Sequence, residues 1–185
     1  MITKEIQKFC PFNEQEAADK AQMLAFLAGY PDAFCRENLL GHMTASAWIV
    51  NPRRDKVLMV WHNLYRSWSW TGGHADGEEN LLQVALKEAR EETGLKHIRP
   101  VTEEIFSLEI LTVDGHEKRG VYVPSHLHLN VTYLLEASEE EPLSICPEEN
   151  SGVAWFSLEE ALAKSTEPWF VERIYKKLIA KLQSI

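Results

Sequence analysis

One stretch of the sequence constrains this chain more than any other, because it joins paired glycines to a short acidic helix. The stretch runs from residue 72 to residue 95 and reads GGHADGEENLLQVALKEAREETGL. Asp76, with Glu79 three residues later, predicts an N-terminal capping box. Gly94 predicts the end of the helix, because glycine readily adopts the left-handed backbone conformation that stops one.

The expected helix has two distinct sides. At about 100° per residue, its apolar residues gather on one side, whereas Glu88, Glu91 and Glu92 gather on a neighbouring one. The helix dipole disfavours carboxylates near this C-terminal end. They form either a solvated acidic face or a site for a hard divalent cation such as Mg²⁺, which prefers oxygen ligands. The residues expected on the buried side are Leu82, Ala85, Leu86, Ala89 and Thr93.

The spacing of the whole stretch closely resembles the Nudix box of the Nudix hydrolases. Five residues separate Gly73 from Glu79, and seven more separate Glu79 from the Lys87–Glu88 pair. Lys87 is the single departure, because the box has arginine at that position. The remaining matches are Ala89, Glu91, Glu92, Gly94 and Leu95.

The resemblance implies a fold and a chemistry. The fold is α/β (α+β), a Nudix-like α/β/α sandwich with a mixed central sheet. It would form a single domain over residues 1–185, with residues 1–40 as a helical N-terminal extension. The activity is pyrophosphohydrolysis of a small nucleotide derivative, a nucleoside diphosphate linked to another group, with Mg²⁺ or Mn²⁺ as cofactor. Such metals neutralise phosphate charge and lower the pKa of bound water.

The resemblance also assigns roles to residues of the box. Glu88, Glu91 and Glu92 become metal ligands, and Glu88 or Glu92 also orients or deprotonates the attacking water. The backbone carbonyl of Gly72 offers a further ligand atom, and Glu79 supports the loop before the helix.

Lys87 leaves a second function open. In the family, the arginine at this position fixes a catalytic glutamate through a forked pair of hydrogen bonds. Lysine keeps the charge but loses the fork. This puts catalytic efficiency in question more than metal binding, so a non-catalytic, nucleotide-binding Nudix domain is the alternative.

An acidic loop outside the box supplies a further candidate ligand. Glu149 lies six residues before Trp155, and some Nudix enzymes have an acidic residue at a similar place, on a loop that reaches the metals. Glu148 is the neighbouring choice. The other interpretation of both is an ordinary solvated loop acid.

Histidines and aromatic residues are candidate substrate contacts. His126, His128 and Asn130 share one face of a predicted strand by alternation, where they either line the substrate cleft or form ordinary hydrogen bonds. A separate metal site there needs further ligands. His74 is placed to contact phosphate, unless capping or exposure explains it. Trp70 is the candidate for base stacking within an aromatic group whose alternative role is packing. This group comprises Trp61, Tyr65, Trp68 and Trp70.

The remaining elements follow from periodicity and turn residues. Asn13 and Glu16 predict a capping box for a helix over residues 13–29, and Ser157 caps a helix after the last strand. Another helix is expected over 168–183, and residues 63–71 are expected to be a loop. The predicted strands cover residues 43–50, 56–62, 104–113, 126–136 and 152–158.

Composition excludes several other classes of protein. The net charge of −9 argues against a long nucleic-acid partner such as capped RNA. No apolar run has the length of a membrane helix, and the N-terminus lacks a signal-peptide core. Three widely spaced cysteines predict free thiols and a cytoplasmic location. They match no motif of the isopentenyl diphosphate isomerases, which resemble Nudix proteins in fold. The oligomeric state stays open, a homodimer included. The cysteines are Cys10, Cys35 and Cys146.

Overall fold

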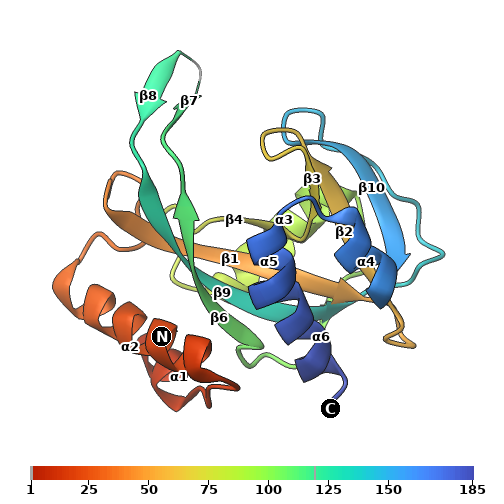
Figure 1. Ribbon diagram of the computed structural model, residues 1–185, viewed down its shortest axis with the longest axis horizontal. Helices are drawn as coiled ribbons and strands as arrows, with labels where there is room; N and C mark the ends of the chain where they lie inside the picture. Colours follow the sequence, from red (N-terminus) through yellow and green to blue (C-terminus); the bar gives the residue numbers. More distant parts are fainter. Residues whose placement is uncertain (1, 119) are drawn as a thin grey trace.

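The computed structural model describes residues 2–118 and 120–185, and a mixed β-sheet forms its centre (Figure 1). The strands are β1 Gly41–Val50, β2 Lys56–His62, β3 Ser67–Ser69, β4 Thr71–His74, β5 Arg99–Pro100, β6 Ser107–Val113, β7 His116–Lys118, β8 Val121–Val123, β9 His126–Glu136 and β10 Asn150–Ser157. The helices are α1 Ile2–Lys8, α2 Glu14–Gly29, α3 Leu81–Thr93, α4 Leu158–Lys164, α5 Pro168–Phe170 and α6 Lys176–Leu182. A π-helical turn, Val171–Tyr175, joins α5 to α6.

Strand β1 lies at the middle of this sheet. The strand order is β10-β2-β1-β9-β5, with β3 paired to β2, β4 to β1 and β6 to β9. β1 and β9 run parallel over their whole register, from Gly41 opposite Leu127 to Val50 opposite Glu136. The pairs that β1 makes with β2 and β4 are antiparallel. The sheet is therefore mixed, as expected.

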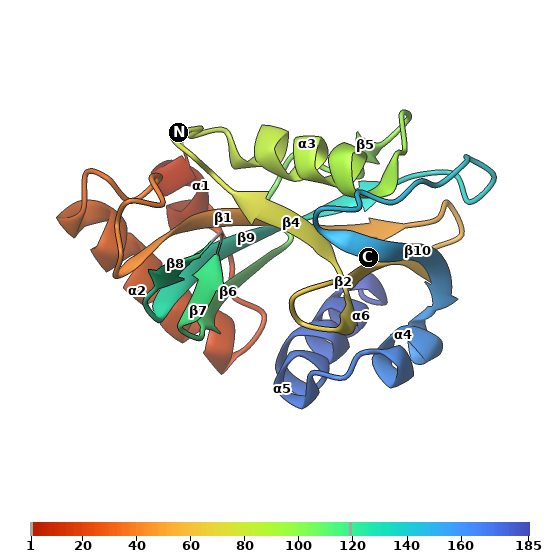
Figure 2. The ribbon, with the colours of Figure 1, turned by 90° about the horizontal axis from the view of Figure 1, so that it is seen from above.

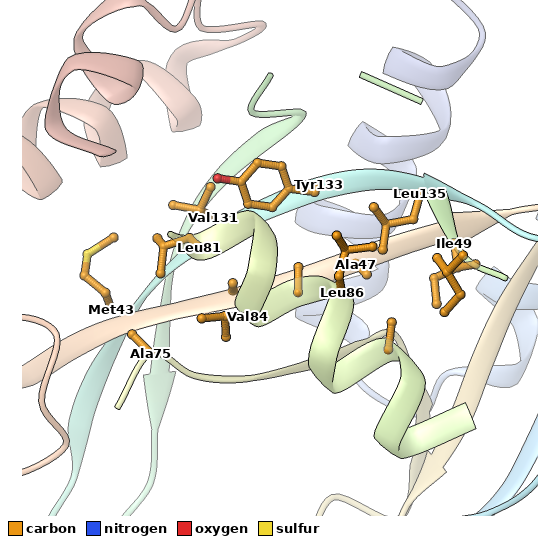
Figure 3. Packing of buried hydrophobic residues seen from close by; sticks show 14 of the residues in the cluster. Met43, Ala47, Ile49, Ala75, Leu81, Val84, Leu86, Val131, Tyr133 and Leu135 are labelled. Atoms are coloured by element: carbon orange, nitrogen blue, oxygen red, sulfur yellow. The ribbon is translucent and has the colours of Figure 1, made fainter. Parts of the chain in front are cut away.

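Alternation along β1 builds a core on each face of the sheet. Met43, Ala47 and Ile49 point to the side covered by α3, where Figure 3 shows them beneath Leu81 and Leu86. Trp48 and Val50 point the other way, into a second cluster formed with the C-terminal helices. Every residue of β1 is buried, because a central strand covered on both faces has no solvated side.

Helices cover both faces, so the molecule is an α/β/α sandwich. Figure 2 shows α3 above the sheet and α4, α5 and α6 below it. Helix α2 packs against β6 beside this body. The β7–β8 hairpin projects beyond the other strands in Figure 1. Within the described residues, no helix combines the length and the apolar character needed to cross a membrane.

The long elements agree well with the sequence, and the short ones do not. Helix α2 begins after its cap Asn13, and β2 and β9 have the predicted bounds. In contrast, β3 and β4 occupy a segment expected to be a loop, and the hairpin of β7 and β8 was not expected. Strand β6 starts at Ser107, β10 starts at Asn150, and the last helix includes a π-helical turn. Strands of three or four residues are too short to show a clear alternation, so their own residues carry little signal.

The start of α3 corrects the predicted capping box. Asn80, not Asp76, caps the helix, and its side chain accepts the N–H of Gln83. Asp76 instead adopts a positive φ of 49° and forms an ion pair with Arg36. Glu79 is exposed in the loop before the cap. Because the chain turns at Asp76 and Gly77, the helix begins at Leu81, several residues later than predicted.

A buried polar network joins the N-terminal and C-terminal helices to the sheet. Glu16 in α2 accepts hydrogen bonds from Lys181 in α6 at 2.7 Å and from Ser107 in β6 at 2.6 Å. Lys177 donates to Glu109 at 2.9 Å beside them. Burial opposes the ionisation of Glu16, but these bonds outweigh it and lower the pKa of the carboxyl group. The ionised form of Glu16 therefore stabilises the fold.

Glu16→Gln tests this network. A buried charge left without its partner costs about 3–5 kcal/mol, so we expect the variant to lose that much free energy of unfolding at pH 7. Because the folded pKa of Glu16 is below the unfolded value of 4.5, this stabilisation is complete above that pH and disappears as the pH falls through the folded pKa. Urea unfolding at pH 7 and pH 3 measures both quantities.

The exposed neighbour Glu14 provides the control for this measurement. Glu14→Gln removes a carboxylate from the first turn of the same helix, where its interaction with the dipole is worth about 1 kcal/mol or less. An equal loss for Glu16→Gln at both pH values would contradict the role of the ionised carboxylate.

Candidate active site

Two glycines in β4 allow α3 to lie directly against the strand. The N–H of Gly72 donates to Oε1 of Glu92 at 2.8 Å. A Cβ atom placed on Gly73 would lie 2.6 Å from Oε2 of Glu88, which is closer than real side chains allow. The missing Cβ atom of Gly73 and the N–H of Gly72 therefore allow two carboxylates of α3 to lie against the β4 backbone.

A third carboxylate reaches the same place from the loop before β10. Oxygen atoms of Glu88, Glu92 and Glu149 all lie within 4.8 Å of one another. The loop is held on both sides: the backbone carbonyl of Glu149 accepts the N–H of Asn63 at 2.9 Å, and Asn150 donates its amide to the carbonyl of Glu92 at 2.9 Å. Glu149, rather than Glu148, is the loop acid in this carboxylate cluster.

Glu91 lies apart from the carboxylate cluster. Its side chain is 54% exposed and lies 3.4 Å from Nζ of Lys87, whereas Glu92 is buried at 3% exposure. The buried arc of α3 is wider than predicted, because it includes Glu92, Leu81 and Val84. The three glutamates of the helix therefore have different environments that their spacing did not reveal.

The carboxylate cluster is electrostatically unfavourable without a cation. Burial, followed by the charges of Glu149 and Glu88, raises the pKa of Glu92 to about 8, although the bond from Gly72 opposes the shift. Burial also raises the pKa of Glu88, against the effect of Lys87. A divalent cation would offset these costs, and the donor atoms are carboxylate oxygens, the type that Mg²⁺ and Mn²⁺ prefer. The residues present therefore fit such an ion.

Lys87 connects two of the glutamates on the outer side of α3. Its Nζ lies 3.2 Å from Oε1 of Glu88 and 3.4 Å from Oε2 of Glu91. The side chain is 64% exposed, so this ammonium group is a solvated point charge rather than a rigid fork. The role predicted for the carbonyl of Gly72 stays a prediction, since the contact described for Gly72 is made by its N–H.

The candidate histidines come together with a residue that the sequence did not single out. His74, His126 and His128 surround His42, and each of their ring centroids lies 5.0 Å from that of His42. We call these residues the histidine cluster. His42 lay just before the predicted strand, but the parallel register of β1 and β9 places it directly beside His128. That register is the signal that periodicity alone could not supply.

Asn130 has the ordinary hydrogen-bonded role. Its Oδ1 accepts from Thr44 at 3.0 Å and from Ser46 at 2.9 Å, and its amide donates to Glu109 at 3.1 Å. The residue is buried at 1% exposure. Its side chain therefore holds β1, β6 and β9 together.

The structure places Trp70 in the core, which corrects its proposed role in base stacking. Trp70 is 7% exposed, and its ring meets those of Phe170 and Tyr175 edge-on at centroid distances of 6.2 and 5.8 Å. The ring turns to this side because Trp70 connects β3 to β4 over the C-terminal helices. Trp61 and Trp68 form another edge-to-face pair at 5.9 Å.

Substitutions of the two glycines should separate the fold from the site. Gly73→Ala meets only the movable end of Glu88, so we expect little change in unfolding temperature and about tenfold weaker Mn²⁺ binding. In Gly72→Ala, the new Cβ would lie 2.7 Å from the carbonyl oxygen of Ala45, which is backbone. This overpacking should cost about 1–3 kcal/mol. Thermal unfolding and calorimetric Mn²⁺ titration measure the two effects.

Gly29→Ala is the matched control, because a Cβ there meets nothing within 4 Å. Its unfolding temperature should stay the same or rise slightly. If all three alanine variants unfolded and bound Mn²⁺ alike, close approach at β4 would not be what shapes the carboxylate cluster.

Comparisons with known proteins agree with this fold. The family model of the NUDIX domain matches residues 41–178. The m7GpppN-mRNA hydrolase NUDT17 of Xenopus laevis is 34% identical over 120 residues, which are 63% of this chain and 38% of that protein. The asymmetrical bis(5'-nucleosyl)-tetraphosphatase of Mus musculus is 30% identical over 95 residues, which are 51% of this chain and 58% of that protein. The chain thus spans less than two thirds of either relative.

A solved structure shows the same fold. The Ap4A hydrolase of C. elegans, in a binary complex, superposes with a TM-score of 0.55 over 77% of this chain and 95% of that one, at 18% sequence identity. The identity is too low to carry more than the fold. The family model, in contrast, covers most of the chain, including both β4 and α3. The chain therefore belongs to the NUDIX domain family.

Proposed function

We propose that this chain is a metal-dependent pyrophosphohydrolase that cleaves a diphosphate linkage in a small nucleotide derivative. The observation that carries the proposal is the carboxylate cluster of Glu88, Glu92 and Glu149, whose oxygens lie within 4.8 Å of one another. A group of acids with Glu92 buried and Glu88 half-buried is costly by itself and becomes favourable around a cation.

Each residue of the site has a part in this reaction. Glu88, Glu92 and Glu149 would hold Mg²⁺ or Mn²⁺, with Gly72 and Glu91 as further predicted ligands. When bound, such an ion would supply charge neutralisation of the diphosphate and a lower pKa for the attacking water. As the water oxygen attacks phosphorus and the phosphoanhydride bond breaks, Glu88 or Glu92 accepts the proton of the water.

The relatives support the class of substrate. Their names, an m7GpppN-mRNA hydrolase and a bis(5'-nucleosyl)-tetraphosphatase, both describe hydrolysis of phosphate-linked nucleotides. The net charge of −9 disfavours a long RNA, so a small nucleotide derivative is the substrate that we propose. Contacts of His74, His126 and His128 with that substrate stay a prediction.

The second candidate function is nucleotide binding without turnover. The observation that favours it is Lys87, because its ammonium group contacts Glu88 through a single atom instead of a fork. Turnover with metal present separates the two functions.

A hydrolysis screen with Glu92→Gln tests the proposed activity. Nucleoside triphosphates, nucleotide sugars, ADP-ribose, dinucleoside polyphosphates and coenzymes are incubated with Mg²⁺ or Mn²⁺, and phosphate-containing products are measured. We expect turnover of one class to fall at least about 100-fold in Glu92→Gln, the scale of a lost general base. Chelating the metal should abolish it.

The unfolding temperature of Glu92→Gln shows whether a loss of turnover is caused by unfolding. In Glu92→Gln, the side-chain carbonyl oxygen that remains can still accept the N–H of Gly72, and the substitution removes a buried group whose pKa is raised to about 8. Without metal, Glu92→Gln should therefore unfold at the same temperature as the wild type or above it. Glu103→Gln, an exposed acid elsewhere, should leave turnover unchanged. No turnover in any class, with metal binding intact, would favour the binding function.

Lys87→Arg tests the departure from the family pattern. Arginine keeps the charge beside Glu88 and replaces the single ammonium nitrogen with two donor nitrogens in a planar fork. We expect kcat to rise by up to about tenfold, equivalent to roughly 1.4 kcal/mol, while KM stays the same. Steady-state kinetics measure both, with Lys96→Arg, an exposed lysine outside the site, as control. A lower kcat in Lys87→Arg would mean that the compact ammonium group itself is required.

A further inference from the structure

The histidine cluster lies on the side of the sheet away from α3. In the register of β1 and β4, Gly73 stands opposite Ala45 and His74 stands opposite Thr44. Ala45 belongs to the core beneath α3, so alternation turns His74 to the other face. His42 and His128 are neighbours across β1 and β9 on that same face. Strand β4 thus separates the histidine cluster from the carboxylate cluster.

The imidazole nitrogens of these residues converge. His42, His74 and His128 each place one ring nitrogen within 4.8 Å of the other two. Nε2 of His126 lies 3.2 Å from Nε2 of His128. Two nitrogen ligands of a tetrahedral zinc ion, each bound at about 2.0–2.1 Å, are separated by roughly 3.3 Å. The converging set is His42, His74 and His128, and rotation of the side chains would be needed for His126 to become a fourth ligand.

Backbone carbonyls orient two of the rings in the manner of metal ligands. Nδ1 of His42 lies 3.3 Å from the carbonyl oxygen of Asn38, and Nδ1 of His126 lies 2.8 Å from that of Pro124. A carbonyl can only accept, so each Nδ1 carries the proton and each Nε2 has a lone pair. Metal-binding histidines are commonly fixed by such a bond from the second ring nitrogen.

One buried ring nitrogen of His42 is in a position that a bound cation would satisfy. The residue is 3% exposed, and its Nε2 has no hydrogen-bond partner within the described part of the chain. A buried polar atom without a partner costs free energy. A cation at the centre of the cluster would satisfy this lone pair.

We propose that His42, His74, His126 and His128 bind a divalent transition-metal ion of the zinc type, at a site separate from the carboxylate cluster. Imidazole ligands select Zn²⁺ and its neighbours, whereas Mg²⁺ selects oxygen. Four protein ligands close the coordination sphere, which is typical of a structural ion. The ion would join β1, β4 and β9.

Zinc titration of the full chain tests this proposal. The purified protein is stripped with a chelator and returned to excess Mg²⁺, so that the carboxylate cluster does not compete for zinc. Calorimetry should show one tightly bound Zn²⁺ ion per chain. Free zinc about 100-fold above Kd should raise the unfolding temperature by about 5 °C or more. Co²⁺ in place of Zn²⁺ should give the visible absorption of tetrahedral nitrogen ligation.

Variants identify the ligands. His74→Gln and His128→Gln should each bind zinc at least about tenfold more weakly and lose the rise in unfolding temperature. His97→Gln is the matched control, because that side chain is 88% exposed and outside the cluster. Glu92→Gln should bind zinc like the wild type. This result would hold whether or not the chain hydrolyses a nucleotide, so the two proposals fail separately.

Several outcomes would overturn the proposal. One is a wild-type chain that binds no zinc, a measurement that depends on no variant's folding. Others are unchanged affinity in both histidine variants, or affinity lost in Glu92→Gln instead. Inorganic phosphate that raised the unfolding temperature of the wild type but not of His128→Gln, with no zinc bound, would make the cluster an anion site. A higher KM for substrate in His128→Gln, with zinc affinity unchanged, would make it a substrate contact.

Discussion

The close contact between α3 and β4 is the constraint on which the candidate site depends. With no Cβ at Gly73, the carboxylate of Glu88 lies against the strand, and the N–H of Gly72 fixes the carboxylate of Glu92. A Cβ atom at Gly73 would push the side chain of Glu88 outward, whereas one at Gly72 would press against β1. The acidic helix and the glycines before it therefore depend on each other. The absence of a Cβ atom at Gly73 is as important to the site as the carboxylates are.

The first part of strand β1 presents apolar residues to one face of the sheet and polar residues to the other. Its odd-numbered residues from Met43 to Ile49 build the apolar floor beneath α3, so the carboxylates on that side stand over a rigid surface. Its even-numbered residues His42, Thr44 and Ser46 face a polar layer that includes Asn130. A central strand can carry polar residues on one face only if each finds a partner. The neighbouring strands provide most of these partners.

The sequence predicted what depends on local pattern and missed what depends on long-range register. The bounds of β9 and the start of α2 follow from alternation and capping. The box spacing selected Glu88 and Glu92, and a looser pattern selected Glu149. In contrast, the place of His42 in its cluster depends on a pairing with β9, about 86 residues away. The orientation of Trp70 depends on helices at the far end of the chain.

The buried bond between Glu16 and Lys181 has a consequence for how the chain reaches its native state. The two residues are 165 positions apart, and both lie outside residues 41–178, which match the family domain. Contacts of such long range form late, because the loop that they close spans 165 positions. During synthesis, Glu16 would remain without Lys181 until α6 had left the ribosome. Helices α2 and α6 therefore meet only after the segments between them have been made.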